Sequence, residues 1–138
     1  MKTIQGPAIF LAQYMGDDPP FADISTAAEW AAGLGFKGLQ IPTWDPRAFD
    51  LAQASESKDW CDDWRAKLDA HGIVPSELST HLQGQLVAVH LAYDILFDAF
   101  AADKVKGNPT ARTEWAIEQV KNCLKESQHL GLTSMVTF

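Results

Sequence analysis

The sequence feature that most constrains the fold is a pattern that occurs three times: a helix-like stretch runs into glycine and then into an apolar strand. The strands expected after these glycines cover residues 36–41, 73–78 and 132–138. A helix that ends at glycine and leads into a strand is the second half of a parallel βαβ unit. The apolar run Ala8–Tyr14 adds a first strand. The sequence therefore predicts an α/β protein with four parallel strands.

Three main helices are expected between these strands. The first begins near Thr26, because Thr26 and Glu29 have the spacing of a capping box. The second spans about Ser55 to Ala70, where Trp60 and Trp64 recur at the spacing of a buried helix stripe.

The segment Leu82–Pro109 interrupts this alternation and is rich in apolar side chains. Loops of this length inside compact domains usually act as lids or hold extra helix. Asp94–Ala102 is predicted to form a short helix, and the third main helix is expected to begin near Thr110.

Two architectures satisfy this order of elements. One is a small doubly wound domain, and the other is half of a (β/α)8 barrel, which normally needs about 250 residues. A nucleotide-binding doubly wound domain has a glycine-rich loop after its first strand. Here that loop is Gly16–Pro20, which has one glycine and two aspartates, and neither G-x-G-x-x-G nor G-x-x-x-x-G-K-[ST] occurs in the chain. In both architectures the chemistry lies past the carboxyl ends of the strands, and this chain finishes on its last expected strand.

The composition is that of an ordinary globular protein of 138 residues in one domain, with 46% apolar and 21% charged residues. A net charge of −7 argues against a nucleic-acid or anionic-membrane surface, since both require clustered Lys and Arg. The sequence has no run of about 18 apolar residues, so no membrane span is expected. The two cysteines, Cys61 and Cys123, are expected to be free thiols, and the expected compartment is the cytoplasm.

The densest polar cluster at an expected strand end runs from Glu77 to Gln85. Glu77, Ser79 and His81 share one parity, so on a strand they point the same way. If that direction is the barrel axis, the His81 imidazole is a candidate acid or base, or a ligand for a hydroxyl. The alternative is a loop histidine bonded to backbone.

Other polar and aromatic residues fall near expected strand ends. Gln13 and Gln40 need partners inside apolar strands, and either a sugar-binding mouth or an ordinary core amide contact supplies them. Trp44 is either a platform for a sugar face or a rim residue. His90 follows His81 at a separation that does not match the zinc helix motif, and we interpret it as a loop residue packed by apolar neighbours.

Three stretches, Ile9–Gln13, Trp30–Asp45 and Glu77–His90, together resemble the start of a sugar phosphate isomerase/epimerase of the xylose-isomerase-like TIM-barrel superfamily. The resemblance covers essentially the whole chain. It implies that residues 1–138 are the N-terminal half of a barrel of about twice this length.

The resemblance also implies a reaction that moves a proton next to a sugar carbonyl, assisted by a divalent metal (Mn, Mg or Zn). The metal ligands and the proton-shuttling carboxylate belong to the other half, so no metal is expected to bind this chain alone, and the chain alone is expected to be inactive. The implied substrate is a small sugar or sugar phosphate. This chain would supply His81 as the catalytic residue and a sugar-pocket wall made by Gln13, Gln40, Trp44, Gln83 and His90.

An alternative function follows from the same half-barrel. The outer edges of the first and last strands would lack partners, and unpaired edges invite pairing with another chain. The chain is then a non-catalytic association module. In either case we expect a homo-oligomer formed through the open sheet edges.

Overall fold

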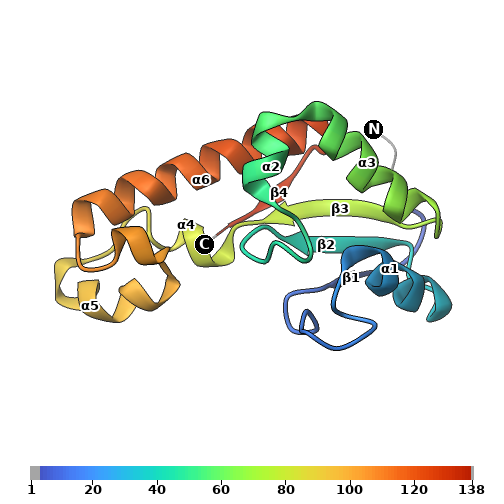
Figure 1. The fold of residues 1–138 in the computed structure, drawn as a ribbon, viewed down its shortest axis with the longest axis horizontal. Helices are drawn as coiled ribbons and strands as arrows, with labels where there is room; N and C mark the ends of the chain where they lie inside the picture. Colours follow the sequence, from blue (N-terminus) through green and yellow to red (C-terminus); the bar gives the residue numbers. More distant parts are fainter. Residues whose placement is uncertain (1–3, 138) are drawn as a thin grey trace.

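Four parallel strands lie side by side in the order of the sequence. The computed structural model describes residues 4–137, and its strands are β1 (Ala8–Phe10), β2 (Gly38–Pro42), β3 (Val74–Ser79) and β4 (Met135–Val136). Every neighbouring pair is parallel, and the order β1-β2-β3-β4 contains no reversal. A doubly wound sheet reverses its strand order at a switch point. The sheet is therefore arranged as one half of a (β/α)8 barrel (Figure 1). Phe138, the last residue of the strand expected at 132–138, lies outside the described residues.

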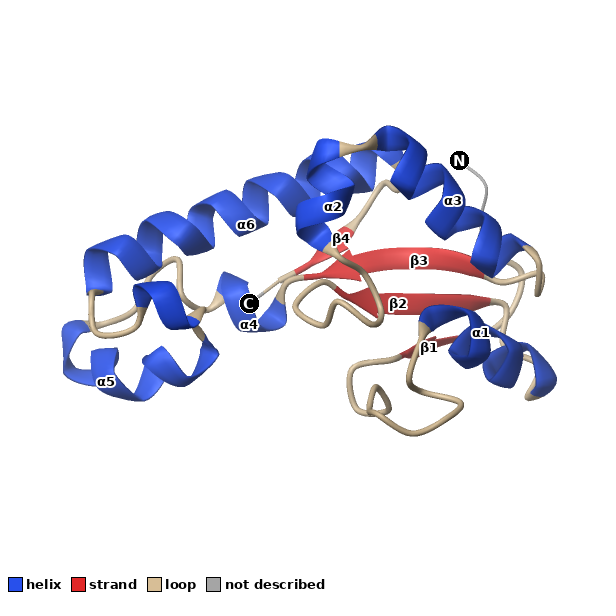
Figure 2. Ribbon diagram, viewed as in Figure 1, coloured by secondary structure: helices blue, strands red, loops and turns tan. Residues whose placement is uncertain are grey.

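Helices alternate with these strands, as Figure 2 shows. Short 3-10 turns lie before and after the helix at residues 94–97; they are η1 (Leu91–Tyr93), η2 (Asp98–Phe100) and η3 (Asp103–Val105). None of the helices within residues 4–137 has both the length and the apolar character needed to cross a membrane. The α-helices are α1 (Ile24–Gly33), α2 (Leu51–Glu56), α3 (Lys58–Asp69), α4 (His81–Gly84), α5 (Asp94–Phe97) and α6 (Pro109–His129).

The predicted second helix is two helices. It begins earlier than expected, at Leu51, because the Asp50 carboxylate caps the first free amides of α2. The chain then breaks at Ser57, whose backbone is extended and whose hydroxyl accepts a hydrogen bond from the Trp60 amide to start α3. The helical region expected at about Ser55 to Ala70 is therefore divided between α2 and α3.

The start of α1 also differs from the prediction. The capping residue is Asp23, whose carboxylate accepts hydrogen bonds from the amides of Ser25 and Thr26. The Thr26 hydroxyl instead donates to the carbonyl oxygen of Pro20 at 2.6 Å. A carboxylate three positions earlier thus replaces the predicted capping box of Thr26 and Glu29.

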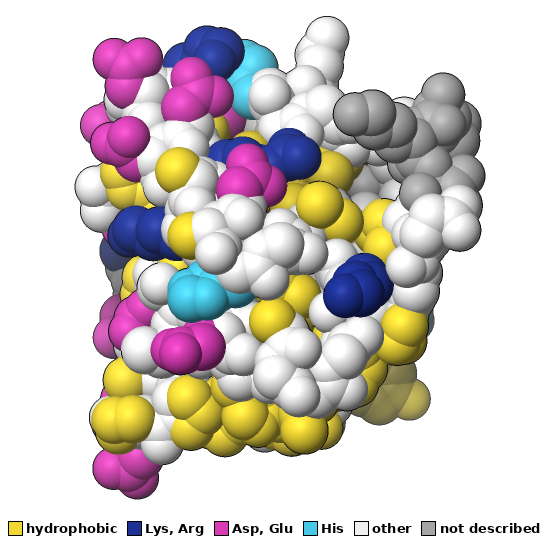
Figure 3. Space-filling model, turned by 90° about the vertical axis from the view of Figure 1, so that its right-hand side faces the viewer, with side chains coloured by type: hydrophobic (Ala, Val, Ile, Leu, Met, Phe, Trp, Pro, Cys, Tyr) yellow, Lys and Arg dark blue, Asp and Glu magenta, His cyan; other side chains and the backbone are white. Residues whose placement is uncertain are grey.

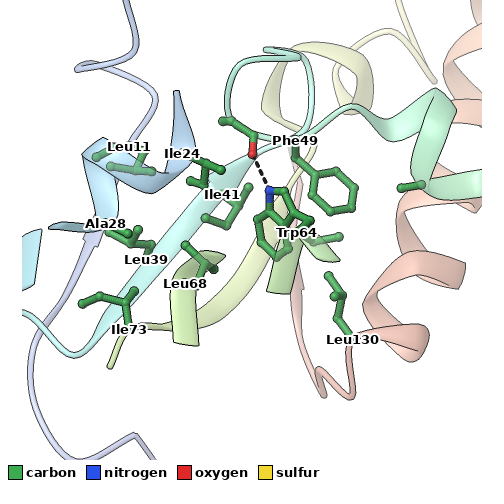
Figure 4. Close-up of a cluster of buried hydrophobic side chains, with 14 of the residues drawn as sticks. Leu11, Ile24, Ala28, Leu39, Ile41, Phe49, Trp64, Leu68, Ile73 and Leu130 are labelled. Atoms are coloured by element: carbon green, nitrogen blue, oxygen red, sulfur yellow. Dashed lines mark hydrogen bonds between the residues drawn. The ribbon is translucent and has the colours of Figure 1, made fainter. Parts of the chain in front are cut away.

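One face of the sheet is covered by helices. Leu39 and Ile41 of β2 and Leu78 of β3 are fully buried in one apolar cluster with side chains of α1, α2, α3 and α6. At the centre of this cluster the indole N–H of Trp64 donates to the carbonyl oxygen of Ala48 at 2.8 Å (Figure 4). Because side chains alternate along a strand, the residues between these apolar positions point to the other face.

Glycine ends three of the helices in the expected way. Gly35, Gly72 and Gly131 follow α1, α3 and α6, and all three have positive φ angles, of 89°, 67° and 70°. This left-handed conformation closes the helix at little cost only for a residue without a Cβ atom. The repeated helix–glycine–strand pattern therefore predicted real turns.

The segment between α4 and α6, which we call the excursion (residues 85–108), forms a second small core. Leu86, Ala101 and Val105 are buried there against Ala116 of α6. The predicted helix at residues 94–102 is confirmed as α5 followed by η2. The excursion lies below the first half of α6, away from the sheet (Figure 1).

A buried arginine ties the excursion to α6. The Arg112 side chain is 1% exposed and forms ion pairs with the carboxylates of Asp94 and Asp98. One of its Nη atoms also donates to the carbonyl oxygen of Asp94 at 2.7 Å. Removing one partner of such a buried pair is costly, because it leaves a charge without compensation.

Both cysteines are free and buried, as expected from the sequence. The Cys61 thiol donates to the fully buried carboxylate of Glu126 at 3.3 Å, and the Nδ1 atom of His129 lies 3.0 Å from the same oxygen. Burial is the main cause that raises the pKa of Cys61 and of Cys123 to about 12.

Candidate functional site

A row of three side chains crosses the face of the sheet that the helices leave open. Phe10 of β1 pairs with Gln40 of β2, and Gln40 pairs with Glu77 of β3. The register between β2 and β3 shifts at this point, because Ser76 is an extra residue between Pro75, opposite Leu39, and Glu77. The bulge therefore brings Glu77 level with Gln40.

Gln40 and Glu77 make a direct polar contact. The Nε2 group of Gln40 donates to Oε1 of Glu77 at 2.5 Å, and both side chains are half-buried. The amide keeps its carbonyl oxygen as an acceptor, and the carboxylate keeps a second oxygen. This pair can accept hydrogen bonds from hydroxyl groups on the open face.

Three aromatic rings gather beside this pair at the carboxyl ends of the strands. Phe10, Trp44 and His81 come from β1, the loop after β2 and the start of α4. The Phe10 and His81 ring centres lie 5.1 Å apart with perpendicular planes, and those of Trp44 and His81 lie 5.8 Å apart. The edge-to-face contact between Phe10 and His81 is favourable and holds these two rings in place.

His81 reaches this cluster by a different route from the one predicted. The strand β3 ends at Ser79, and Thr80 leaves the extended conformation with φ of −115° and ψ of 36°. His81 is the first residue of α4, so the alternation that relates Glu77 to Ser79 does not extend to it. It nevertheless lies just past a strand end, as expected.

Backbone and hydroxyl contacts hold the loops at this end of the sheet. The amide and the hydroxyl of Thr43 both donate to the carbonyl oxygen of Ser79, at 3.0 and 2.9 Å. The amide of Thr80 donates to the carbonyl oxygen of Val136 at 2.8 Å. These bonds continue the strand pairing past β2 and β3, and they fix the starting points of the loops that carry Trp44 and His81.

An ion-pair network links the loops after β1 and β2. The Arg47 guanidinium donates to both oxygens of Asp45, at 2.9 and 2.8 Å, and to Asp17 at 2.5 Å. The hydrogen bonds from Arg47 are the main cause that lowers the pKa of Asp45 below its ordinary value. The bidentate geometry fixes the loop that presents Trp44.

A cavity of about 360 Å³ opens next to the aromatic cluster. It lies between the loop after β2, α4, the excursion and α6, and aromatic rings make much of its wall. Gln83 of α4 also lines it and is 3% exposed, and its Oε1 atom receives no hydrogen bond from the described part of the chain. Residues that line the cavity include Trp44, Phe49, Gln83, Phe100, Trp115 and Gln119.

The structure brings some of the predicted site residues together and leaves others apart. Trp44 and His81 share the aromatic cluster, and Trp44 and Gln83 line the cavity. Gln13 is exposed in the turn after β1. His90 is exposed in the excursion, where its Nδ1 atom accepts a hydrogen bond from the Ala92 amide at 3.2 Å and caps η1.

Within residues 4–137, no three side chains of His, Cys, Asp or Glu are grouped so that they could hold a metal ion.

Sequence reasoning missed two contributors to this site. Phe10 was assigned only to the apolar first strand, although it lies at the end of β1 and faces the open side. Arg47 was given no role from the sequence, and the signal that could have identified it is the Asp45-Pro46-Arg47 sequence directly after a strand end.

No protein-family model matches the chain. None of the curated proteins matches it either. Among solved structures, the chain is similar to a D-psicose 3-epimerase from Clostridium cellulolyticum H10, described with D-tagatose, at 17% sequence identity and a TM-score of 0.42. The match covers 93% of this chain and 50% of that one, so the chain spans about half the length of this neighbour.

Proposed function

We propose that this chain is the N-terminal half of a sugar or sugar phosphate isomerase/epimerase barrel, and that its open face forms one wall of the sugar pocket. The observation that carries the proposal is the Gln40–Glu77 pair next to the rings of Phe10, Trp44 and His81. Sugars present apolar C–H faces to aromatic rings and hydroxyl groups to amides and carboxylates. Both kinds of group stand side by side here at the carboxyl ends of parallel strands, where barrel enzymes hold their substrates.

Each residue then has a role that its position allows. Gln40 and Glu77 accept hydrogen bonds from adjacent sugar hydroxyls, and Trp44 supports a face of the sugar. His81 exchanges a proton with a hydroxyl group near the rings, since an imidazole can act as a general acid or base. A divalent metal, where the intact barrel holds one, stabilises negative charge on a sugar oxygen. We expect its ligands to come from the other half of the barrel, so none of these roles passes through it.

Titration of the isotope-labelled chain with D-tagatose and with D-fructose 6-phosphate, followed by NMR, tests this proposal. We expect the shift changes to concentrate on Phe10, Gln40, Trp44 and His81. Replacing Gln40 with leucine removes one hydrogen-bonding group and should weaken binding by about five- to tenfold. Gln128→Leu is the matched control, because Gln128 is exposed on α6.

Binding that is equally weakened by both substitutions would contradict the proposed wall, and so would shift changes confined to the helical face. Absence of binding at millimolar sugar would show that these residues do not hold a sugar by themselves. Melting temperatures of both variants, measured by circular dichroism, exclude unfolding as the cause.

A second candidate function rests on the sheet edges. Within the described residues, β1 pairs only with β2, and β4 pairs only with β3. The outer edges of these strands can accept a strand from another chain. The chain would then act as an association module without catalysis, and sugar titration combined with the measurement of oligomeric state separates the two functions.

A further inference from the structure

A second cavity lies at the opposite end of the sheet, where the strands begin. Its volume is about 610 Å³, and it is bounded by the segment before β1, the start of β3 and the turn between α6 and β4. Figure 3 views this end of the molecule and shows hydrophobic side chains set among polar and basic ones. No residue of the proposed sugar wall lines this cavity.

The charge of this cavity is opposite to the charge of the molecule. The chain has 18 acidic residues and 11 lysines and arginines. The charged residues that line the cavity are nevertheless both basic, Lys37 and Arg65. In Figure 3 most acidic side chains lie along one edge of this face. A concave site whose walls carry one sign of charge attracts ligands of the other sign.

Lys37 is held in place by its backbone and by the packing of its side chain. Its backbone amide donates to the carbonyl oxygen of Pro7 at 2.8 Å, and its own carbonyl accepts from the Val74 amide at 3.1 Å. Its side chain lies over Gly6, where an added Cβ atom would stand 2.5 Å from the Lys37 Cγ atom. No carboxylate of residues 4–137 forms an ion pair with its ammonium group.

Arg65 is fixed on another wall of the cavity. Its Nη1 atom donates to the carbonyl oxygen of Leu130 at 2.9 Å, which anchors the guanidinium at the end of α6. Its Nε atom lies 3.6 Å from Asp69, a long and partly exposed ion pair that is weak in water. The Asp69 carboxylate is outside the cavity lining, so it offsets part of the guanidinium charge without occupying the site.

The rest of the wall is mainly apolar. Ile4, Val74, Pro75, Leu130 and Leu132 line the cavity together with the two cations. Apolar walls with a few placed charges are typical of sites for small organic molecules. A ligand that fits has an anionic group for the cations and an apolar body for the walls.

We propose that this cavity binds a small organic anion with an apolar body, through Lys37 and Arg65. The site is separate from the sugar wall and does not depend on the proposed enzymatic function. Octanoate is the probe for this chemistry, 1-octanol is the same body without the charge, and acetate is the charge without the body.

Calorimetric titration of the full chain tests the proposal. Octanoate should bind once per chain, more tightly than octanol or acetate, and its affinity should fall as salt is added. Lys37→Gln should weaken octanoate binding about tenfold, because a charge-assisted contact is lost. Lys121→Gln is the matched control, with the same change of charge at an exposed position of α6, and it should leave the affinity unchanged.

Each other outcome overturns the proposal. Equal affinities for octanoate and octanol mean an apolar pocket without anion recognition, and equal affinities for octanoate and acetate mean that the apolar wall has no part. Equal effects of Lys37→Gln and Lys121→Gln remove Lys37 from the site. NMR shift changes must include the amides of Ser76 and Leu132, and changes at Trp44 instead would place the anion in the sugar wall.

Discussion

Replacing Trp64 with phenylalanine should destabilise the protein much more than the same change at Trp60. Both indoles pack edge-to-face on Phe49, with ring centres 4.9 and 5.2 Å away, and phenylalanine can keep that contact. Trp64 is 2% exposed, and its N–H donates to the carbonyl oxygen of Ala48 in the core. Trp60 is only partly buried, and its indole makes no hydrogen bond to the described part of the chain.

The magnitude follows from two losses at Trp64. Leaving the buried Ala48 carbonyl without its donor costs about 1–3 kcal/mol. The space vacated by the smaller ring adds roughly 1 kcal/mol, because a packed core relaxes only partly. We therefore expect Trp64→Phe to lower the free energy of unfolding by about 2–4 kcal/mol, and Trp60→Phe by less than about 1 kcal/mol.

Urea unfolding followed by circular dichroism at 222 nm measures both changes without relying on tryptophan fluorescence. The midpoint should shift while the slope of free energy against urea stays constant, which keeps the comparison within two-state behaviour. Equal losses for the two variants would refute the reasoning, because they would mean that the hydrogen bond to Ala48 contributes nothing beyond ring packing.

Three further predictions concern charge, thiol reactivity and association. Because hydrogen bonds from Arg47 lower the folded-state pKa of Asp45, that carboxylate stabilises the fold above its unfolded pKa of about 4, and the contribution is lost as the pH falls through the lowered value. Asp45→Asn should thus cost about 1 kcal/mol in urea unfolding at pH 7 and little at pH 2, and a constant loss at both pH values would contradict this account. Cys61 and Cys123, with pKa values raised to about 12, should resist iodoacetamide at pH 8 until urea is added, as read by mass spectrometry; rapid native labelling would show that they are accessible. Light scattering at micromolar concentration should detect dimers or larger species formed through the edges of β1 and β4, whereas a stable monomer would mean that these edges do not pair.

The sequence predicted the fold well where local chemistry decides it. Gly35, Gly72 and Gly131 mark helix ends because a left-handed residue is needed there, and that need does not depend on distant contacts. Helix starts were harder to predict, since several polar residues compete for the same free amides. Asp23 and Ser57 cap helices where Thr26 and an uninterrupted helix were expected.

The site was less predictable because it depends on contacts between strands. The position of Glu77 opposite Gln40 follows from a one-residue bulge, and nothing in the local sequence around Ser76 reveals it. His81 lies just past a strand end, as predicted. It is the first residue of α4, so it does not follow the strand alternation of Glu77 and Ser79 that was expected to orient it. Trp44 belongs to the ring cluster and also lines the cavity. The cavity forms only when the excursion, which is distant in sequence, folds beside Trp44.

Helix α6 spans two separate apolar cores, and this gives the protein two units that can open independently. Its second half, with Cys123, packs on the sheet, and its first half, with Ala116, packs on the excursion. Amide hydrogens of the excursion can therefore exchange with solvent through an opening that leaves the sheet intact. The ion pairs of Arg112 with Asp94 and Asp98 join the excursion to α6 and add to the free energy of that opening. One wall of the 360 Å³ cavity belongs to the excursion, so we expect opening of the excursion to release a ligand from this cavity while the sheet stays folded.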